Sequence, residues 1–164
     1  MDPLITIESL QKARRCSTAS KAIEALAVEI RAYQRRETSS EGRLVWLTGG
    51  WISGLGGRES ADLLEGAMWE FIPELEKALA TIGAAQSLEY LKKLIEVCGG
   101  VLPSDEKERS ELIESKYEAL ARLDKIYRSV VTEESAEALL QFLEVQTAKQ
   151  EKCTRQAGHM GAEK

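Results

Sequence analysis

Paired carboxylates are the residues of this chain whose spacing comes nearest to a catalytic pattern. Glu70 and Glu74 lie four residues apart, as do Glu114 and Glu118, so each pair would share one face of a helix. A glycosidase or a two-metal centre needs such carboxylates aimed into a cleft, usually with histidine support. The neighbouring leucines place most of these acids on the opposite, solvent-facing side. A hydrolase that uses paired carboxylates is therefore the least favoured alternative.

A dense group of glycines is the second candidate. Five of the twelve glycines fall within residues 49–57, where they could cradle a phosphate. The segment lacks the GxxxxGK[ST] pattern, however, and Gly54-Leu55-Gly56 has no third glycine at the GxGxxG position. The group instead predicts a tight turn or a helix that packs very closely against a neighbour.

Cysteine and histidine are too sparse for a metal centre or a nucleophilic enzyme. Cys16, Cys98 and Cys153 are far apart and form no CxxC pair, and the single histidine, His159, lies in a polar segment. A serine or cysteine nucleophile would also need a nearby base. The sequence therefore predicts no catalytic residue, no metal ligand and no cofactor, and it indicates that the protein is not an enzyme.

Helical periodicity accounts for most of the chain. Pro73 suits the first turn of a helix, Gly83 suits its end, and Gly99-Gly100 would end the next one. Asp105 and Glu108 have the spacing of a capping box. No strand-like alternation lasts long enough to build a sheet, so we expect an all-α fold, a single compact bundle of six or seven helices. The predicted helices span about 4–16, 20–36, 60–70, 73–82, 84–98 and 105–130, and a last helix is capped by Thr132.

The same pattern predicts the organisation of the chain. We expect a helical domain over residues 1–147, with a loop at 38–42, and a polar, disordered C-terminal tail over 148–164. Apolar stretches are too short to span a membrane, and the N-terminus lacks a basic region followed by an apolar core. These features favour a cytoplasmic protein without a membrane partner.

Charge is distributed unevenly along the sequence. The net charge is −5, but residues 61–147 carry eighteen acidic and nine basic residues, whereas both flanking segments are slightly basic. An acidic body repels nucleic-acid phosphates and disfavours direct binding to DNA or RNA. It would suit a basic protein partner, although ordinary solubility also explains such a charge.

Two kinds of residue could form a protein-binding surface. Trp51, beside Gly49-Gly50, is either a core residue or an interface anchor, because tryptophan is enriched in both places. Rigid helices that carry spaced carboxylates can imitate the phosphate rows of DNA. The predicted protein-binding residues are Glu65, Glu70, Glu74, Glu76, Glu108, Glu111 and Trp51.

Four short segments resemble one family in the same order along the chain. They are Gly49-Gly50-Trp51, residues 77–84 with the pattern "AL..IGA", residues 103–109 with the pattern "P.D...R", and Leu123-Asp124 with Tyr127. The sequence resembles the DNA-mimic protein C-terminal-like domain family, a group of small helical bacterial proteins. The chain departs from the family pattern at Thr48, where the family has asparagine.

The resemblance implies an all-helical domain without a known catalytic centre and, in one member, a dimer that mimics duplex DNA toward a DNA-binding protein. We therefore expect a non-enzymatic module whose acidic helices bind a basic protein, with DNA mimicry as its specific form. An immunity or antitoxin-like inhibitor of a toxin is the alternative, since it needs the same kind of surface. Pairing with a second copy of the chain stays open.

Overall fold

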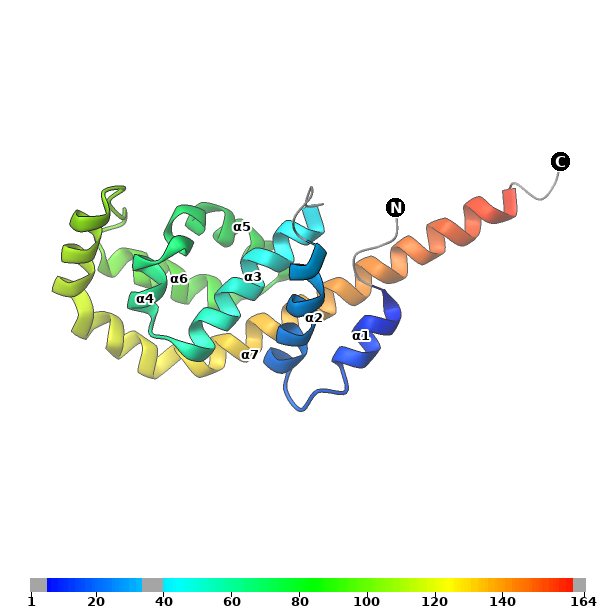
Figure 1. Ribbon diagram of the computed structural model, residues 1–164, viewed down its shortest axis with the longest axis horizontal. Helices are drawn as coiled ribbons and strands as arrows, with labels where there is room; N and C mark the ends of the chain where they lie inside the picture. Colours follow the sequence, from blue (N-terminus) through cyan, green and yellow to red (C-terminus); the bar gives the residue numbers. More distant parts are fainter. Residues whose placement is uncertain (1–5, 34–39, 161–164) are drawn as a thin grey trace.

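The computed structural model describes residues 6–33 and 40–160, and these residues form helices joined by short connections (Figure 1). This part of the chain contains no strand, so the predicted all-α bundle of six or seven helices is confirmed. The helices are α1 (Ile7–Ala13), α2 (Ala19–Tyr33), α3 (Ser40–Gly57), α4 (Ser60–Glu65), the 3-10 helix η1 (Ala67–Phe71), α5 (Ile72–Ile82), α6 (Ala85–Val97) and α7 (Glu106–Met160).

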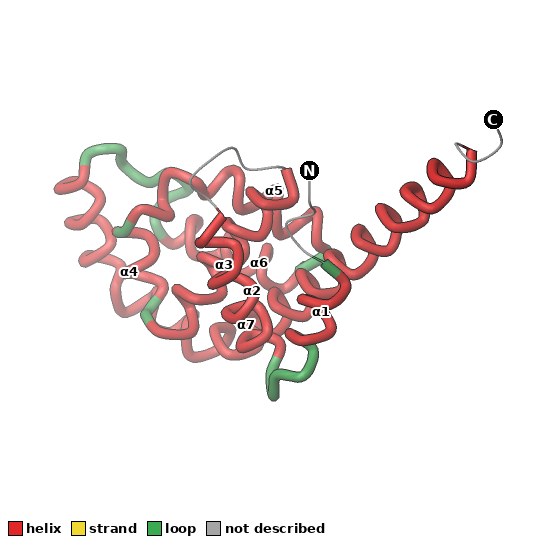
Figure 2. The backbone as a smooth tube through the Cα atoms, turned by 45° about the vertical axis from the view of Figure 1, so that its right-hand side comes forward, coloured by secondary structure: helices red, strands yellow, loops and turns green. Residues whose placement is uncertain are grey.

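Helix α7 is the backbone of the architecture. It curves past α4 and α3, continues along α2 and α1, and extends beyond the other helices toward the C-terminus (Figures 1 and 2). All six other α-helices pack against it. The bundle is thus organised around one long helix rather than around helices of similar length.

The predicted break in this helix at Thr132 is wrong. Thr132 lies inside α7, where its Oγ1 donates to the carbonyl oxygen of Arg128 at 2.6 Å instead of capping a new helix. The helices that precede α7 pack on both sides of this residue: Tyr90 of α6 contacts Asp124 before it, and Ser87 contacts Glu134 after it. A threonine inside a helix can donate to the carbonyl four residues earlier, so its residue type alone does not mark a helix boundary.

Local signals predict several helix ends correctly. Pro73 lies in the first turn of α5, and Gly83 ends that helix with a φ of 79°. Gly99 and Gly100 both have a φ of 91° after α6, a conformation that favours glycine. Asp105 accepts a hydrogen bond from the backbone nitrogen of Glu108 at 2.9 Å, as expected for a residue that caps α7.

The glycine group is entirely helical and lies in the second half of α3. A β-carbon on Gly54 would come within 2.1 Å of Cδ2 of Leu63, so its absence lets α4 approach α3. One of the two predicted explanations, a closely packed helix, is therefore confirmed. The predicted loop at 38–42 is wrong for residues 40–42, which begin α3; residues 38 and 39 lie outside the described part.

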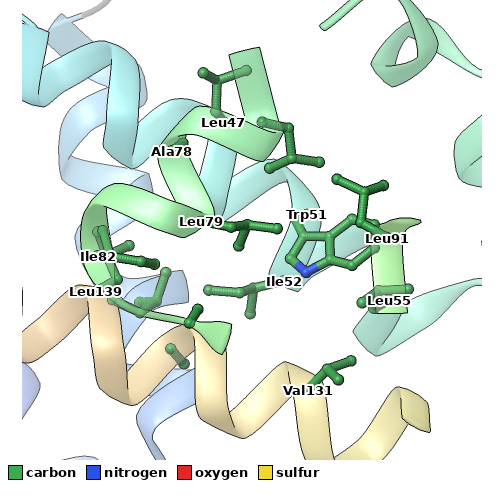
Figure 3. Close-up of a cluster of buried hydrophobic side chains, with 14 of the residues drawn as sticks. Leu47, Trp51, Ile52, Leu55, Ala78, Leu79, Ile82, Leu91, Val131 and Leu139 are labelled. Atoms are coloured by element: carbon green, nitrogen blue, oxygen red, sulfur yellow. The ribbon is translucent and has the colours of Figure 1, made fainter. Parts of the chain in front are cut away.

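All seven α-helices contribute buried residues to the core, and Figure 3 shows the part of it between α3, α5, α6 and α7. Leu79, Leu94 and Leu139 are completely buried, and the aromatic rings of Trp51, Tyr90 and Tyr127 form a continuous row. Figure 3 shows Trp51 among leucine and isoleucine side chains from α3, α5 and α6. Burial of these apolar groups is the main stabilising contribution to the bundle.

Two carboxylates of α7 cap the N-termini of other helices. Asp124 accepts a hydrogen bond from the backbone nitrogen of Ser60 at 2.9 Å, at the start of α4. Glu134 accepts hydrogen bonds from the backbone nitrogens of Gln86 and Ser87, at 2.9 and 2.7 Å, at the start of α6. Neither helix has a hydrogen-bonding cap from its own preceding residue, so α7 supplies the missing acceptors.

Helix α7 continues through residues 148–160, where the sequence predicts a disordered tail; residues 161–164 are outside the described part. The division into a domain over 1–147 and a separate tail stays a prediction. None of the described helices is both long and apolar enough to cross a membrane. Cys16, Cys98 and Cys153 are all free thiols.

Candidate functional site

Helices α4 and α7 lie side by side and bring acidic residues from both onto one surface. Oγ of Ser110 donates to Oε1 of Glu65 at 3.0 Å, and the hydroxyl of Tyr117 donates to Oε2 of Glu59 at 2.6 Å. Glu65, at the end of α4, contacts residue 110 of α7, whereas Glu59, just before α4, contacts residue 117. The two helices therefore run in opposite directions. We call the carboxylates along them the acidic surface: Glu59, Asp62 and Glu65 beside α7, and Glu111, Glu114 and Glu118 on α7.

The carboxylates of this surface follow helical spacing. Asp62 and Glu65 are exposed and lie three residues apart in α4, about 4.5 Å along the helix axis. Glu59, which is partly exposed, immediately precedes the helix as its N-cap residue. Glu111, Glu114 and Glu118 recur at three and four residues and are all exposed. Two helices therefore present two rows of negative charge to solvent.

Tyr117 lies between these rows and is 47% exposed. The hydrogen bond to Glu59 and the charge of that carboxylate raise the pKa of Tyr117, and the charge of Asp62 acts in the same direction. The tyrosine therefore remains protonated and offers a flat, partly apolar contact inside an otherwise anionic area. Aromatic residues in such positions are common in protein interfaces.

Basic residues offset only part of the negative charge on α7. The Lys107 ammonium lies 3.8 Å from Glu111, and the Arg122 guanidinium lies 3.6 Å from Glu118. All four side chains are strongly exposed, so solvent and salt screen both pairs. Among the described residues, no hydrogen bond or ion pair reaches Glu114, which leaves its carboxylate available to a partner.

The 3-10 helix η1 contacts the start of α7 and carries one more of the predicted glutamates, Glu70. The guanidinium of Arg109 lies 4.2 Å from the ring centre of Trp69, and its Nη1 donates to the carbonyl oxygens of Pro103 and Ser104. Arg109 is only 5% exposed, so it stabilises the start of α7 rather than neutralising the surface. Glu70, the next residue after Trp69, is exposed.

The predicted glutamates fall into two groups. Glu65 and Glu111 belong to the acidic surface, and Glu108 is exposed in the first turn of α7. Glu70 lies on η1, and the other two lie on α5: Glu74 is paired with Arg43 at 2.9 Å, and Glu76 lines a shallow groove of about 480 Å³ with Lys92 and Glu96. Opposite charges beside Glu74 and Glu76 make α5 a weaker candidate for binding a basic protein.

The structure places Trp51 in the core, away from any partner surface. It is 2% exposed, and its ring centre lies 5.8 Å from that of Tyr90. The prediction of Trp51 as a contact residue is therefore replaced by its other interpretation, core packing. Trp51 is buried where α6 approaches α3 and brings the Tyr90 ring against it.

Sequence reasoning missed Glu59, Asp62 and Tyr117. The sequence shows Glu59 and Asp62 at the start of the predicted helix over 60–70. It does not show on which side of α7 that helix packs. The carboxylate pairs weighed as catalytic do not converge: Glu118 pairs with Arg122 and Glu74 with Arg43. In the described part of the chain, no three histidine, cysteine or acidic side chains lie close enough together to hold a metal ion.

Comparison with known families bears on the same helices. The model of the DMP19-like protein family matches residues 57–146, which include α4, η1, α5, α6 and most of α7. The chain belongs to the DMP19-like protein family. This is a family of DNA mimics, so the resemblance inferred from short segments is confirmed. No curated protein and no solved structure matches the chain.

The family motifs have structural roles in this chain. Asp124 caps α4 and also accepts a hydrogen bond from the hydroxyl of Tyr90 at 2.5 Å, while Tyr127 stacks on the Tyr90 ring at 5.6 Å. Burial, followed by the hydrogen bond to Asp124, raises the pKa of Tyr90. Gly83 permits the turn between α5 and α6, and Arg109 stabilises the start of α7. The motifs therefore preserve the scaffold that carries the acidic surface.

Proposed function

We propose that this protein is a non-enzymatic binding module that presents the acidic surface of α4 and α7, as a mimic of DNA, to a basic DNA-binding protein in the bacterial cytoplasm. The observation that carries this proposal is the gathering of exposed carboxylates from two neighbouring helices within the segment that matches a DNA-mimic family. A protein that binds duplex DNA has rows of lysine and arginine that meet phosphates. Carboxylates at regular spacing offer the same charge to those side chains.

Rigidity supports this function because a preorganised surface loses little entropy on binding. Asp124 fixes the start of α4, and Arg109 fixes the start of α7. Tyr117 joins the two helices through Glu59. The carboxylates are thus held on helices whose relative position is set by buried contacts and hydrogen bonds.

The experiment is affinity capture with the full chain at a series of salt concentrations. We expect a DNA-binding protein to be retained at about 50 mM salt, released at several hundred millimolar, and displaced by added duplex DNA, because screening weakens charged association. The variant E65K/E111K/E114K should lose the captured protein. A matched control, E8K/E24K/E96K, reverses three exposed glutamates outside the acidic surface and should retain it.

Two outcomes would contradict the proposal. One is that both triple variants capture the partner equally well, which would show that net charge rather than this surface drives binding. The other is a partner whose retention is independent of salt and of duplex DNA, because a mimic of DNA must compete with DNA for the same basic residues.

A further inference from the structure

Two large apolar side chains of α7 are exposed just beyond the acidic surface. Ile126 is 65% exposed and Val130 is 50% exposed, and because they lie four residues apart they are neighbours on the helix surface. In Figure 1, this stretch of α7 is the yellow part along the lower edge of the bundle. Two exposed basic residues, Arg122 and Lys125, lie beside them. We call Arg122, Lys125, Ile126 and Val130 the basic-apolar patch.

The sign of the charge on α7 changes between the acidic surface and this patch. The Arg122 guanidinium lies 3.6 Å from Glu118, the last carboxylate of the acidic surface. Between Glu118 and Glu133 the only acid in the sequence is Asp124, whose carboxylate already caps α4. A partner that meets the row of carboxylates therefore finds positive charge and apolar surface within about 12 Å along the same helix.

The acidic surface is smaller than a complete protein interface. Its carboxylates on α7 extend about 11 Å, from Glu111 to Glu118, and packed helices such as α4 and α7 lie about 8–10 Å apart. A stable complex buries about 800 Å² on each partner, equal to a square with sides of about 28 Å. A partner on the acidic surface must therefore contact neighbouring residues as well, and the basic-apolar patch continues that surface along the same helix.

We propose that the basic-apolar patch determines specificity within the same interface, by binding an apolar segment with acidic residues beside the DNA-binding surface of the partner. The partner is the DNA-binding protein of the proposed function, on which this inference rests. A surface that imitates phosphates alone attracts any basic protein that binds DNA. Ile126 and Val130 add apolar contact with one partner, whereas Arg122 and Lys125 repel partners that are basic throughout.

Reversal of the two basic residues gives opposite results for a selective and an unselective surface. The probes are the DNA-binding protein that the full chain retains in the salt-series capture and a synthetic oligolysine peptide, which has no acidic side chain. R122E/K125E should bind the retained protein at least about tenfold more weakly than the native protein does, but oligolysine more tightly. The control K77E/K92E makes the same change in net charge at exposed lysines outside the patch and should not weaken binding to either probe.

A second variant, I126S/V130S, tests the apolar part of the patch. Its affinity for the retained protein should fall at least about tenfold, and equally at about 50 and about 300 mM salt, because salt screens charges and not apolar contacts. Its affinity for oligolysine should be unchanged. The matched control V101S/V145S replaces two exposed valines outside the patch and should bind the retained protein like the native chain.

The results distinguish failure of this inference from failure of the proposed function. If R122E/K125E binds the retained protein as tightly as the native chain or more tightly, the partner recognises negative charge alone, and selection by the patch is overturned while mimicry stands. Native-like binding by I126S/V130S, or equal weakening by either control, has the same meaning. If the native chain retains no protein that duplex DNA displaces, the proposed function and the selective patch both fail.

Discussion

Gly54 offers the sharpest test of how the fold is assembled, because the structure predicts that alanine there has an effect opposite to its usual one. In an exposed helix, glycine to alanine stabilises by about 1 kcal/mol. At Gly54, however, the new β-carbon would lie 2.1 Å from Cδ2, 3.1 Å from Cγ and 3.3 Å from Cδ1 of Leu63. Carbon atoms in contact prefer about 3.5–4.0 Å, so Leu63 or α4 must move.

The size of the effect follows from these two opposing terms. Overpacking of a buried site costs about 1–3 kcal/mol, and the helical preference of alanine recovers about 1 kcal/mol of it. We therefore expect Gly54→Ala to lower the free energy of unfolding by about 1 kcal/mol. A β-carbon on Gly56, two residues later in α3, would meet no atom within 4 Å, so Gly56→Ala should raise stability by up to about 1 kcal/mol.

Urea denaturation monitored by circular dichroism measures both variants and their coupling to Leu63. Leu63→Ala removes the atoms that the new β-carbon would meet, so Gly54→Ala should become stabilising when it is introduced into the Leu63→Ala protein. If Gly54→Ala and Gly56→Ala stabilise the native protein equally, the close approach of α4 to α3 at this point is refuted.

Three other changes test contacts made by α7. Glu134→Gln should lower the free energy of unfolding by about 1–2 kcal/mol in urea denaturation, because it weakens the charged acceptor for the start of α6; no loss would contradict the capping role. Arg14→Ala should cost about 1 kcal/mol or less, since the ion pairs of Arg14 with Glu137 and Glu144 are partly exposed. The hydrogen bond from Arg14 lowers the pKa of Glu137, so this stabilisation exists above the ordinary glutamate pKa of about 4.3 and is lost as pH falls through the lowered value. In thermal melts, the difference in melting temperature between the native protein and Arg14→Ala should therefore be larger at pH 7 than at pH 3. Thr132→Ala should leave stability within about 0.5 kcal/mol of native, whereas the loss of a true helix cap would cost about 1 kcal/mol.

The elements that the sequence predicted best are those whose cause is local. Pro73, Gly83 and the pair Gly99-Gly100 determine helix ends through their own backbone preferences, and the structure has helix ends at these places. Asp105 caps α7 through a residue three positions away. Such signals need no knowledge of the rest of the fold.

Predictions failed where the cause lies far away in the sequence. The continuity of α7 through Thr132 depends on the other helices that pack along its length, and no local residue indicates it. The burial of Trp51 depends on the approach of α6, which brings Tyr90 to its ring. An aromatic residue beside two glycines fits an interface and a core equally well until its neighbours are known.

The candidate site shows the same division. Helical spacing correctly placed Glu65 and Glu111 on exposed helix positions. The pairing of Glu74 with Arg43 joins residues 31 positions apart, and the contact of Tyr117 with Glu59 joins residues 58 positions apart. Sequence reasoning therefore identified negative charge but could not tell which carboxylates gather on one surface.

The two caps supplied by α7 have a consequence for synthesis of the chain on the ribosome. The start of α4 needs Asp124, which follows Ser60 by 64 positions, and the start of α6 needs Glu134, which follows Ser87 by 47 positions. Until Asp124 and Glu134 have been synthesised and have left the exit tunnel, the first turns of α4 and α6 lack these caps. We therefore expect the bundle to acquire its stable form late in translation, when the middle of α7 becomes available to the helices that precede it.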